Sequence, residues 1–307
     1  MGILAYLAAR ARWVLVIGVF IGILLPGLAA VVRPLLVPVI VLMLSGALLR
    51  LDWAGLRAYA REPGLAAMLV GWQLLATPLL GWILLQPLDL PVGLELALLL
   101  NAAAPPILSS PVFAQLLGLD AALAFLGVVL GTLLLPLSLT LLLLVLPDLG
   151  LGVTAGPFLA RVSLLIGLPF GLSLGLRRCW SEASTARLAP TIDGLNVVLL
   201  LVFAVAVMDG VAARIAQAPG VVGLWLLAAC LMSAWLHLMG YGLFRWLGWR
   251  RAYSVSILSG NRNMALMMAV TAGFSGADFA LYVALAQVPM YCVPLVFTPL
   301  VRRHAAA

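Results

Sequence analysis

The sequence predicts an all-α polytopic membrane protein with about ten transmembrane helices. The 307 residues are 65% hydrophobic and only 9% charged, with a mean hydropathy of +1.22, whereas a soluble domain carries about 25% charged residues. Apolar stretches long enough to cross a bilayer recur along the whole chain. They are continuous, unlike the short alternating segments of a transmembrane β-barrel.

Hydropathy divides the chain into ten predicted spans, each long enough to cross the hydrocarbon core. The connections between them are short, so no separate soluble domain is expected. In chain order, the predicted spans are 13–32, 35–51, 64–86, 92–117, 120–146, 157–177, 190–209, 219–247, 252–273 and 278–301.

The arginines predict how these spans are oriented. All 17 basic residues are Arg, and cytoplasmic loops of membrane proteins carry an excess of such residues. With both termini in the cytoplasm, the inner positions are Arg10, Arg12, Arg50, Arg57, Arg61, Arg177, Arg178, Arg187, Arg245, Arg250, Arg251, Arg302 and Arg303, and the outer ones are Arg33, Arg161 and Arg214. The net charge of +7 therefore reflects membrane orientation and not a nucleic-acid partner. We expect the inner (plasma) membrane of a bacterium.

Two predicted spans are interrupted. The fourth reads LALLLNAAAPPILSSPVFAQLLG, where Pro105 and Pro106 lack backbone donors and break the helix. The ninth contains SILSGNRNMALMM, which Gly260 interrupts next to Arg262. Broken backbone at membrane depth survives only where it is buried in protein or lines a watery cavity.

The interruptions fall in the fourth span of each set of five. This pattern is typical of two inverted repeats with a substrate site near the membrane midplane. The predicted repeats are residues 1–150, containing spans 1–5, and residues 151–307, containing spans 6–10.

Polar residues around the two breaks are the candidate substrate-binding residues. The N-termini of half-helices attract anions, and an arginine favours a carboxylate or sulfonate. A central Arg costs about 2.5–3.5 kcal/mol on insertion scales, so Arg262 is expected either to bind an anionic substrate or to cap carbonyl groups of the broken helices. The candidates are Asn101, Ser109, Ser110, Asn261, Arg262 and Asn263.

Four segments, in order, resemble the bile acid:sodium symporter family. They are LMLSGALLRLDWAGLRAYAREP, VGWQLLATPLLGW with Gln73 and Pro78, APPILSSPVFAQLLGLD and SGNRNMAL. The last two resemble the family's Pro-Gly-Gly-x-x-Ser-Asn and Glu-x-Gly-x-Gln-Asn sequences. The resemblance covers most of the chain and implies a divergent member of this family.

The resemblance implies ten helices in two domains. A panel domain would contain spans 1, 2, 6 and 7, and a core domain spans 3–5 and 8–10, with the broken helices crossing in the core. An organic anion would bind between the domains, and an elevator-like or rocking movement would expose it alternately to each side. Sodium would bind behind the crossing.

The sodium ligands implied by the resemblance are altered in this chain. Leu258 falls on the family's Glu and Arg262 on its Gln, while hydroxyls of the fifth span are lost. The modified ion-coupling set is Gln73, Ser109, Ser110, Ser259 and Arg262. Because a hard cation takes several oxygen ligands, Na⁺ binding is doubtful. The hypothesis is that the guanidinium stands in permanently for sodium.

The predicted function is secondary active transport of an organic anion. The alternatives are a sodium- or proton-coupled symporter with a modified site, an anion channel and a membrane sensor without transport. Proton coupling would use Asp193, Glu95 or His237, although Asp193 also fits a helix-start charge and His237 a hydrogen bond to a neighbouring helix. His304 is read as part of the C-terminal tail.

No enzyme is expected, because no paired nucleophile and base or metal-binding pattern occurs. The three cysteines are far apart and have no CxxC spacing. The expected partners are a small organic anion and the lipid bilayer, with no nucleic acid, no metal and no cofactor apart from the doubted Na⁺. The sequence leaves the oligomeric state open and is compatible with a monomer.

Overall fold

The structure, a computed structural model, contains helices and no β-strand among the residues that it describes. Those residues are 4, 6, 11–50, 62–146, 154–180 and 182–306. The predicted inner arginines Arg10, Arg57 and Arg61 lie outside them.

Seven helical stretches of the described chain are long and apolar enough to cross a membrane. They are Pro26–Leu49, Pro63–Leu88, Ala121–Val145, Ala155–Cys179, Arg187–Gln217, Pro219–Leu247 and Gly276–Ala305. The prediction of an all-helical membrane protein is therefore confirmed. The ten-span arrangement in inverted repeats stays a prediction.

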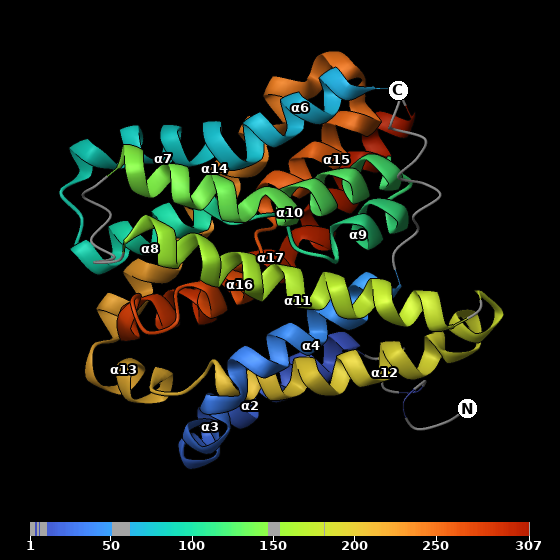
Figure 1. The fold of residues 1–307 in the computed structure, drawn as a ribbon. Coiled ribbons are helices and arrows are strands. Elements are labelled where there is room, and N and C mark those ends of the chain that lie inside the picture. The colour runs from blue at the N-terminus through green and yellow to red at the C-terminus, as the bar shows by residue number, and fades with distance from the viewer. Residues whose placement is uncertain are drawn as a thin grey trace. The chain divides into compact units, whose positions relative to one another are not determined.

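The helices carry the labels of Figure 1. The α-helices are α2 (Ala11–Leu24), α3 (Pro26–Val32), α4 (Leu36–Leu49), α6 (Pro63–Gly71), α7 (Thr77–Leu85), α8 (Val92–Ala103), α9 (Ser110–Leu116), α10 (Ala121–Val145), α11 (Ala155–Cys179), α12 (Glu182–Ala206), α13 (Val211–Gln217), α14 (Pro219–Phe244), α15 (Trp249–Gly260), α16 (Met264–Val270) and α17 (Gly276–Ala306). Short 3-10 segments are η1 (Arg33–Leu35), η4 (Gln86–Leu88) and η6 (Arg245–Leu247), and η3 (Trp72–Ala76) is a π-helical turn.

The chain divides into two compact units, and each draws on both halves of the sequence. The first unit comprises Met1–Leu51, Arg161–Val222 and Met268–Ala272, and the second comprises Asp52–Ala160, Gly223–Met267 and Gly273–Ala307. The predicted repeats 1–150 and 151–307, and the panel and core domains, stay predictions.

In the first unit, α12 packs along α2 and α4 (Figure 1). Two ion pairs join this bundle. Arg33 Nη1 lies 2.9 Å from Asp209 Oδ2, and Arg50 Nε lies 2.9 Å from Asp193 Oδ1. Asp193, which the sequence offers as a proton-coupling residue, thus has a structural partner in the same unit.

The first helix break lies earlier than predicted. The sequence places it between spans 13–32 and 35–51, but the chain leaves the helix at Leu25, with φ −121° and ψ 68°. A residue before proline is disfavoured in the α conformation, and Pro26 follows. Pro34 is instead accommodated at the start of the 3-10 segment η1, so residues 26–49 continue as one candidate span.

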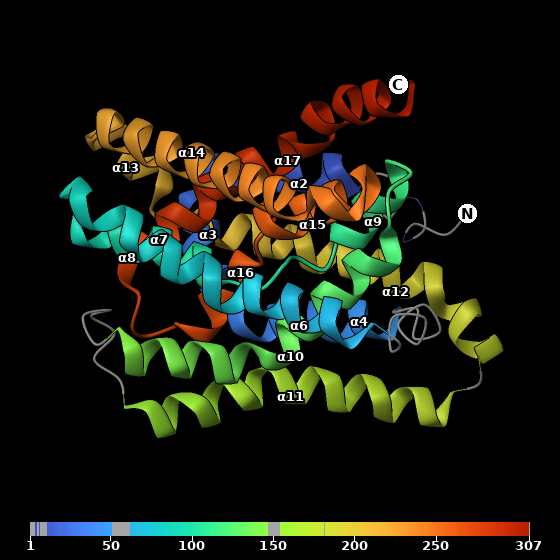
Figure 2. The ribbon, with the colours of Figure 1, turned by 90° about the horizontal axis from the view of Figure 1, so that it is seen from above.

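In the second unit, α10 packs against α6, α9 and α15, and α8 packs against α7 and α17. Both predicted interruptions are present. The chain is non-helical between α8 and α9, around Pro105 and Pro106, and again between α15 and α16, after Gly260. Figure 2 shows the extended segment between α8 and α9 passing beside the end of α15.

Candidate functional site

The two interrupted segments cross in the second unit and bond through their backbones. Ile107 N donates to Asn261 O at 2.8 Å, and Asn263 N donates to Pro105 O at 2.7 Å. Pro106 and Arg262 form an isolated antiparallel bridge at this point. Buried backbone groups need partners, and each break supplies the partners that the other lacks.

The crossing leaves backbone carbonyls of neighbouring helices available to side chains. Pro105 and Pro106 have no N–H groups, so carbonyls near the end of α8 lose their helical donors. The π-helical turn η3 similarly disturbs the regular bonding around Gln73. Thr77 Oγ1 lies 2.8 Å from Gln73 O and 2.9 Å from Ala102 O, and therefore joins the third predicted span to the fourth.

Arg262 places its guanidinium among these oxygens. Its Nη1 donates to Ala104 O at 2.8 Å and to Gln73 O at 3.2 Å, and its Nη2 donates to Thr77 Oγ1 at 3.0 Å. The residue is only 3% exposed. The predicted carbonyl-capping role is therefore present in the structure, whereas contact with a substrate stays a prediction.

The charge of Arg262 has no acidic counterpart among the described residues. All three of its hydrogen-bond acceptors are neutral oxygens. The described ion pairs use Arg33, Arg50 and Arg251 instead. A guanidinium has five N–H donors, and the Nε–H of Arg262 has no acceptor in the described part of the chain.

The asparagines of the site differ in their bonding. Asn263 Oδ1 accepts from Leu266 N at 3.0 Å and caps the first turn of α16. Asn101 Nδ2 donates to Tyr282 Oη at 2.6 Å, while its Oδ1 has no partner. Asn261 is fully buried, and neither polar atom of its amide has a hydrogen-bond partner among the residues that the structure describes.

The predicted ion-coupling residues are only partly brought together. Gln73 contacts Arg262 through its carbonyl, but its buried amide group has no partner. Ser259 Oγ instead accepts from Trp72 Nε1 at 2.8 Å. Ser109 precedes α9 without a side-chain cap bond, and Ser110 is buried with an unpartnered Oγ.

Leu258 stands where the resembling family has a glutamate, and the side chains around it are apolar as well. Leu258 is fully buried in a hydrophobic cluster with Val128 and Ile257. A Cβ added to Gly127 would lie 2.6 Å from Leu258 Cδ1 and 3.0 Å from Gln73 Nε2, so both side chains occupy the space beside that glycine. None of the described residues of this cluster carries a carboxylate.

A small cavity lies beside Arg262. Its volume is about 10 Å³, which is room for about one water molecule. The polar residues that line it are Asn101, Ser233, Arg262 and Gln287. A cavity of this size has no room for an organic anion.

His237 explains why the ninth-span break requires glycine. A Cβ on Gly260 would overlap the His237 ring. The ring nitrogen Nδ1 donates to Ser233 O at 2.7 Å, because a carbonyl can only accept. This ring bond lies within α14, and the hydrogen bond to a neighbouring helix is made by the backbone instead, where His237 O accepts from Ser256 Oγ of α15 at 2.7 Å. The Nε2 atom is buried and has no partner.

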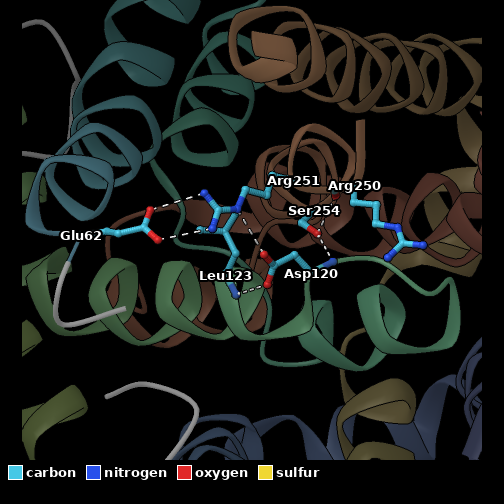
Figure 3. Close-up of polar contacts among 6 residues, drawn as sticks. All are labelled: Glu62, Asp120, Leu123, Arg250, Arg251 and Ser254. Atoms are coloured by element: carbon cyan, nitrogen blue, oxygen red, sulfur yellow. Dashed lines mark hydrogen bonds and ion pairs between the residues drawn. The ribbon is translucent and has the colours of Figure 1, made fainter. Parts of the chain in front are cut away.

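A second polar network fixes the starts of three helices in the same unit (Figure 3). Arg251 lies 3.3 Å from Glu62 Oε1 and 3.5 Å from Asp120 Oδ2. Asp120 also caps α10 by accepting from Leu123 N at 2.9 Å. The network joins α6, α10 and α15, and it has a structural role in holding the broken helix α15.

Sequence reasoning missed several residues of this region. Thr77 lies one helical turn after Gln73, and that spacing is the signal that could have identified it. Tyr282 and Gln287 lie far away in the sequence, and no local pattern connects them to Asn101. His304, read as tail, in fact lies 3.1 Å from Tyr253 Oη through its Nδ1.

A sequence model of the sodium bile acid symporter family matches residues 37–218. The match covers more than half of the 307 residues and includes Gln73, Asn101, Ser109 and Ser110. It ends before the second interruption at Asn261, Arg262 and Asn263. No curated protein matches the chain.

Proposed function

The chain belongs to the sodium bile acid symporter family, and from this premise we propose that it is a secondary active transporter of an organic anion. The protein is an integral membrane protein and a transporter of this family. The proposal adds alternating access, ten spans in inverted repeats and cytoplasmic termini in a bacterial inner membrane. The substrate binds at the crossing, next to Arg262, and no cofactor takes part.

The observation that carries the proposal is the bonding of the Arg262 guanidinium. Two backbone carbonyls and one hydroxyl surround it, and such oxygens are the ligands that a hard cation takes. The guanidinium supplies a permanent positive charge where these oxygens converge. We therefore propose that the anion binds without sodium.

The oxygens that bond Arg262, and Leu258 nearby, do not fit a sodium ion. The carbonyls of Gln73 and Ala104 already accept from Arg262. Leu258 provides no oxygen and is packed among apolar side chains. A sodium ion at this point would also lie close to a fixed positive charge, which repels it.

A sodium- or proton-coupled symporter is the second candidate. It is favoured by the buried oxygens of Gln73, Ser110 and Asn261, which have no hydrogen-bond partner among the described residues. Unpaired buried polar atoms are costly, and an ion is one way to satisfy them. An anion channel and a sensor without transport are the remaining alternatives, and the flux measurement described next distinguishes them.

The test is uptake of radiolabelled taurocholate, benzoate and pyruvate into proteoliposomes that contain the purified protein. Sodium and choline salts are compared at equal ionic strength. The proposal expects saturable uptake of at least one anion at equal rates in the two salts. Uptake that requires sodium would favour the second candidate, non-saturable flux would favour a channel, and binding without flux would indicate a sensor.

A further inference from the structure

The buried charge at the crossing has a consequence for the transport cycle. Arg262 is 3% exposed and bonds only to neutral oxygens of Gln73, Thr77 and Ala104. Among the described residues no carboxylate pairs with it. A buried charge without a counter-charge is costly, and dipoles of carbonyl groups offset only part of that cost.

An anionic substrate changes this balance. A carboxylate or sulfonate bound to the guanidinium cancels the charge and provides an acceptor for the Nε–H, which finds none among the described residues. The other polar side chains that line the adjoining cavity, Asn101, Ser233 and Gln287, are neutral. The loaded site therefore has no net charge with a monoanion, and a net charge of about −1 with a dianion.

An alternating-access carrier reorients its site twice in each cycle. For uptake into an anion-free compartment, the site crosses once loaded and returns empty. The loaded site is neutral, but the empty site moves an uncompensated guanidinium through the low-dielectric interior. The empty return is therefore the slow step, whereas exchange of one anion for another avoids it.

We infer that the protein is an obligatory exchanger of organic monoanions, in which the fixed charge of Arg262 suppresses the return of the empty carrier. This inference rests on the proposed transport function, and it adds that transport occurs by exchange and that the substrate carries a single negative charge. The insertion cost of a central arginine corresponds to a rate difference of roughly a hundredfold. Net uptake is expected to be slower than exchange by at least about tenfold.

The experiment uses the full-length protein in proteoliposomes. Vesicles are loaded either with the unlabelled probe or with potassium chloride of equal osmolarity, and the uptake of labelled taurocholate, benzoate or pyruvate is measured. Exchange predicts uptake at least about tenfold faster into probe-loaded vesicles. It also predicts that a membrane potential set with valinomycin does not change this uptake, because like charges cross in both directions.

The outcomes separate the two proposals. Equal uptake into both kinds of vesicle overturns obligatory exchange but leaves anion transport intact. Uptake into loaded vesicles that follows the membrane potential also overturns it. Absence of uptake of all three probes in both kinds of vesicle contradicts the transport function itself, and the inference fails with it.

A variant tests the role of the fixed charge. Arg262→Gln removes the charge and weakens anion binding, so it is assayed at high probe concentration, where the ratio of exchange to net uptake should fall toward one. Arg161→Gln is the matched control, because Arg161 Nη2 donates to Ala272 O at 2.6 Å and also caps a backbone carbonyl. An unchanged ratio in a folded Arg262→Gln protein would overturn the inference. If this variant does not fold, the effect of the membrane potential on uptake by the wild-type protein still tests the inference.

Discussion

Replacing Thr77 by valine removes one acceptor of the buried guanidinium and keeps the shape of the side chain. Thr77 Oγ1 accepts from Arg262 Nη2 at 3.0 Å and lies 2.8 Å and 2.9 Å from the carbonyl oxygens of Gln73 and Ala102. The residue is fully buried, so water cannot replace the lost bonds. Hydrogen bonds to charged groups contribute about 1.5–3 kcal/mol.

The expected loss for Thr77→Val is therefore about 2–3 kcal/mol in the free energy of unfolding. The measurement is chemical unfolding of the purified protein in detergent micelles. Thr132→Val is the matched control, because Thr132 is 1% exposed and its Oγ1 has no hydrogen-bond partner. That substitution removes an unpaired buried hydroxyl, so it should be neutral or stabilising.

Comparison of the two variants decides whether the bonds at the crossing stabilise the fold. A Thr77→Val protein as stable as Thr132→Val would show that Thr77 does not bond the guanidinium as described. It would also weaken the view that Arg262 is held by oxygens suited to a cation.

Two further predictions concern the same crossing. The double substitution Leu258→Glu with Arg262→Gln restores the carboxylate and the amide of the resembling family. Sodium should therefore raise the apparent unfolding temperature of the double variant but not that of the wild type. No response of the double variant to sodium would refute the stand-in role of the guanidinium. Gly260→Ala should destabilise the protein by several kcal/mol or prevent folding, because its Cβ would overlap the His237 ring. Gly242→Ala on α14, which would meet no atom within 4 Å, should be tolerated in the same unfolding assay.

Much of the fold could be predicted from the sequence, because lipid imposes simple requirements on it. Apolar length identifies spans, and the two breaks follow from Pro105, Pro106 and Gly260, which have local chemical signals. The first break was placed wrongly because Pro26 and Pro34 carry the same local signal. Long-range packing, such as the ion pair of Arg33 with Asp209, is invisible in the local sequence.

The candidate site was predictable only in part. Arg262 stood out as a permanent cation in an apolar span, and its capping of carbonyls was one of two predicted roles. Its acceptors could not be identified, because two of them are backbone oxygens at Gln73 and Ala104, and every residue has such an oxygen. Thr77 lies one helical turn after Gln73, and this spacing is a local signal, but the π-helical turn η3 between them has no pattern of its own in the sequence.

The most direct test of the central claim is thermal unfolding of the purified protein with a panel of organic anions, in sodium and again in choline salts. A ligand that binds the folded state raises the apparent stability. If Arg262 serves as a built-in cation, at least one anion should raise the unfolding temperature by the same amount in both salts. Stabilisation that appears only with sodium would contradict the account and identify a sodium-coupled site.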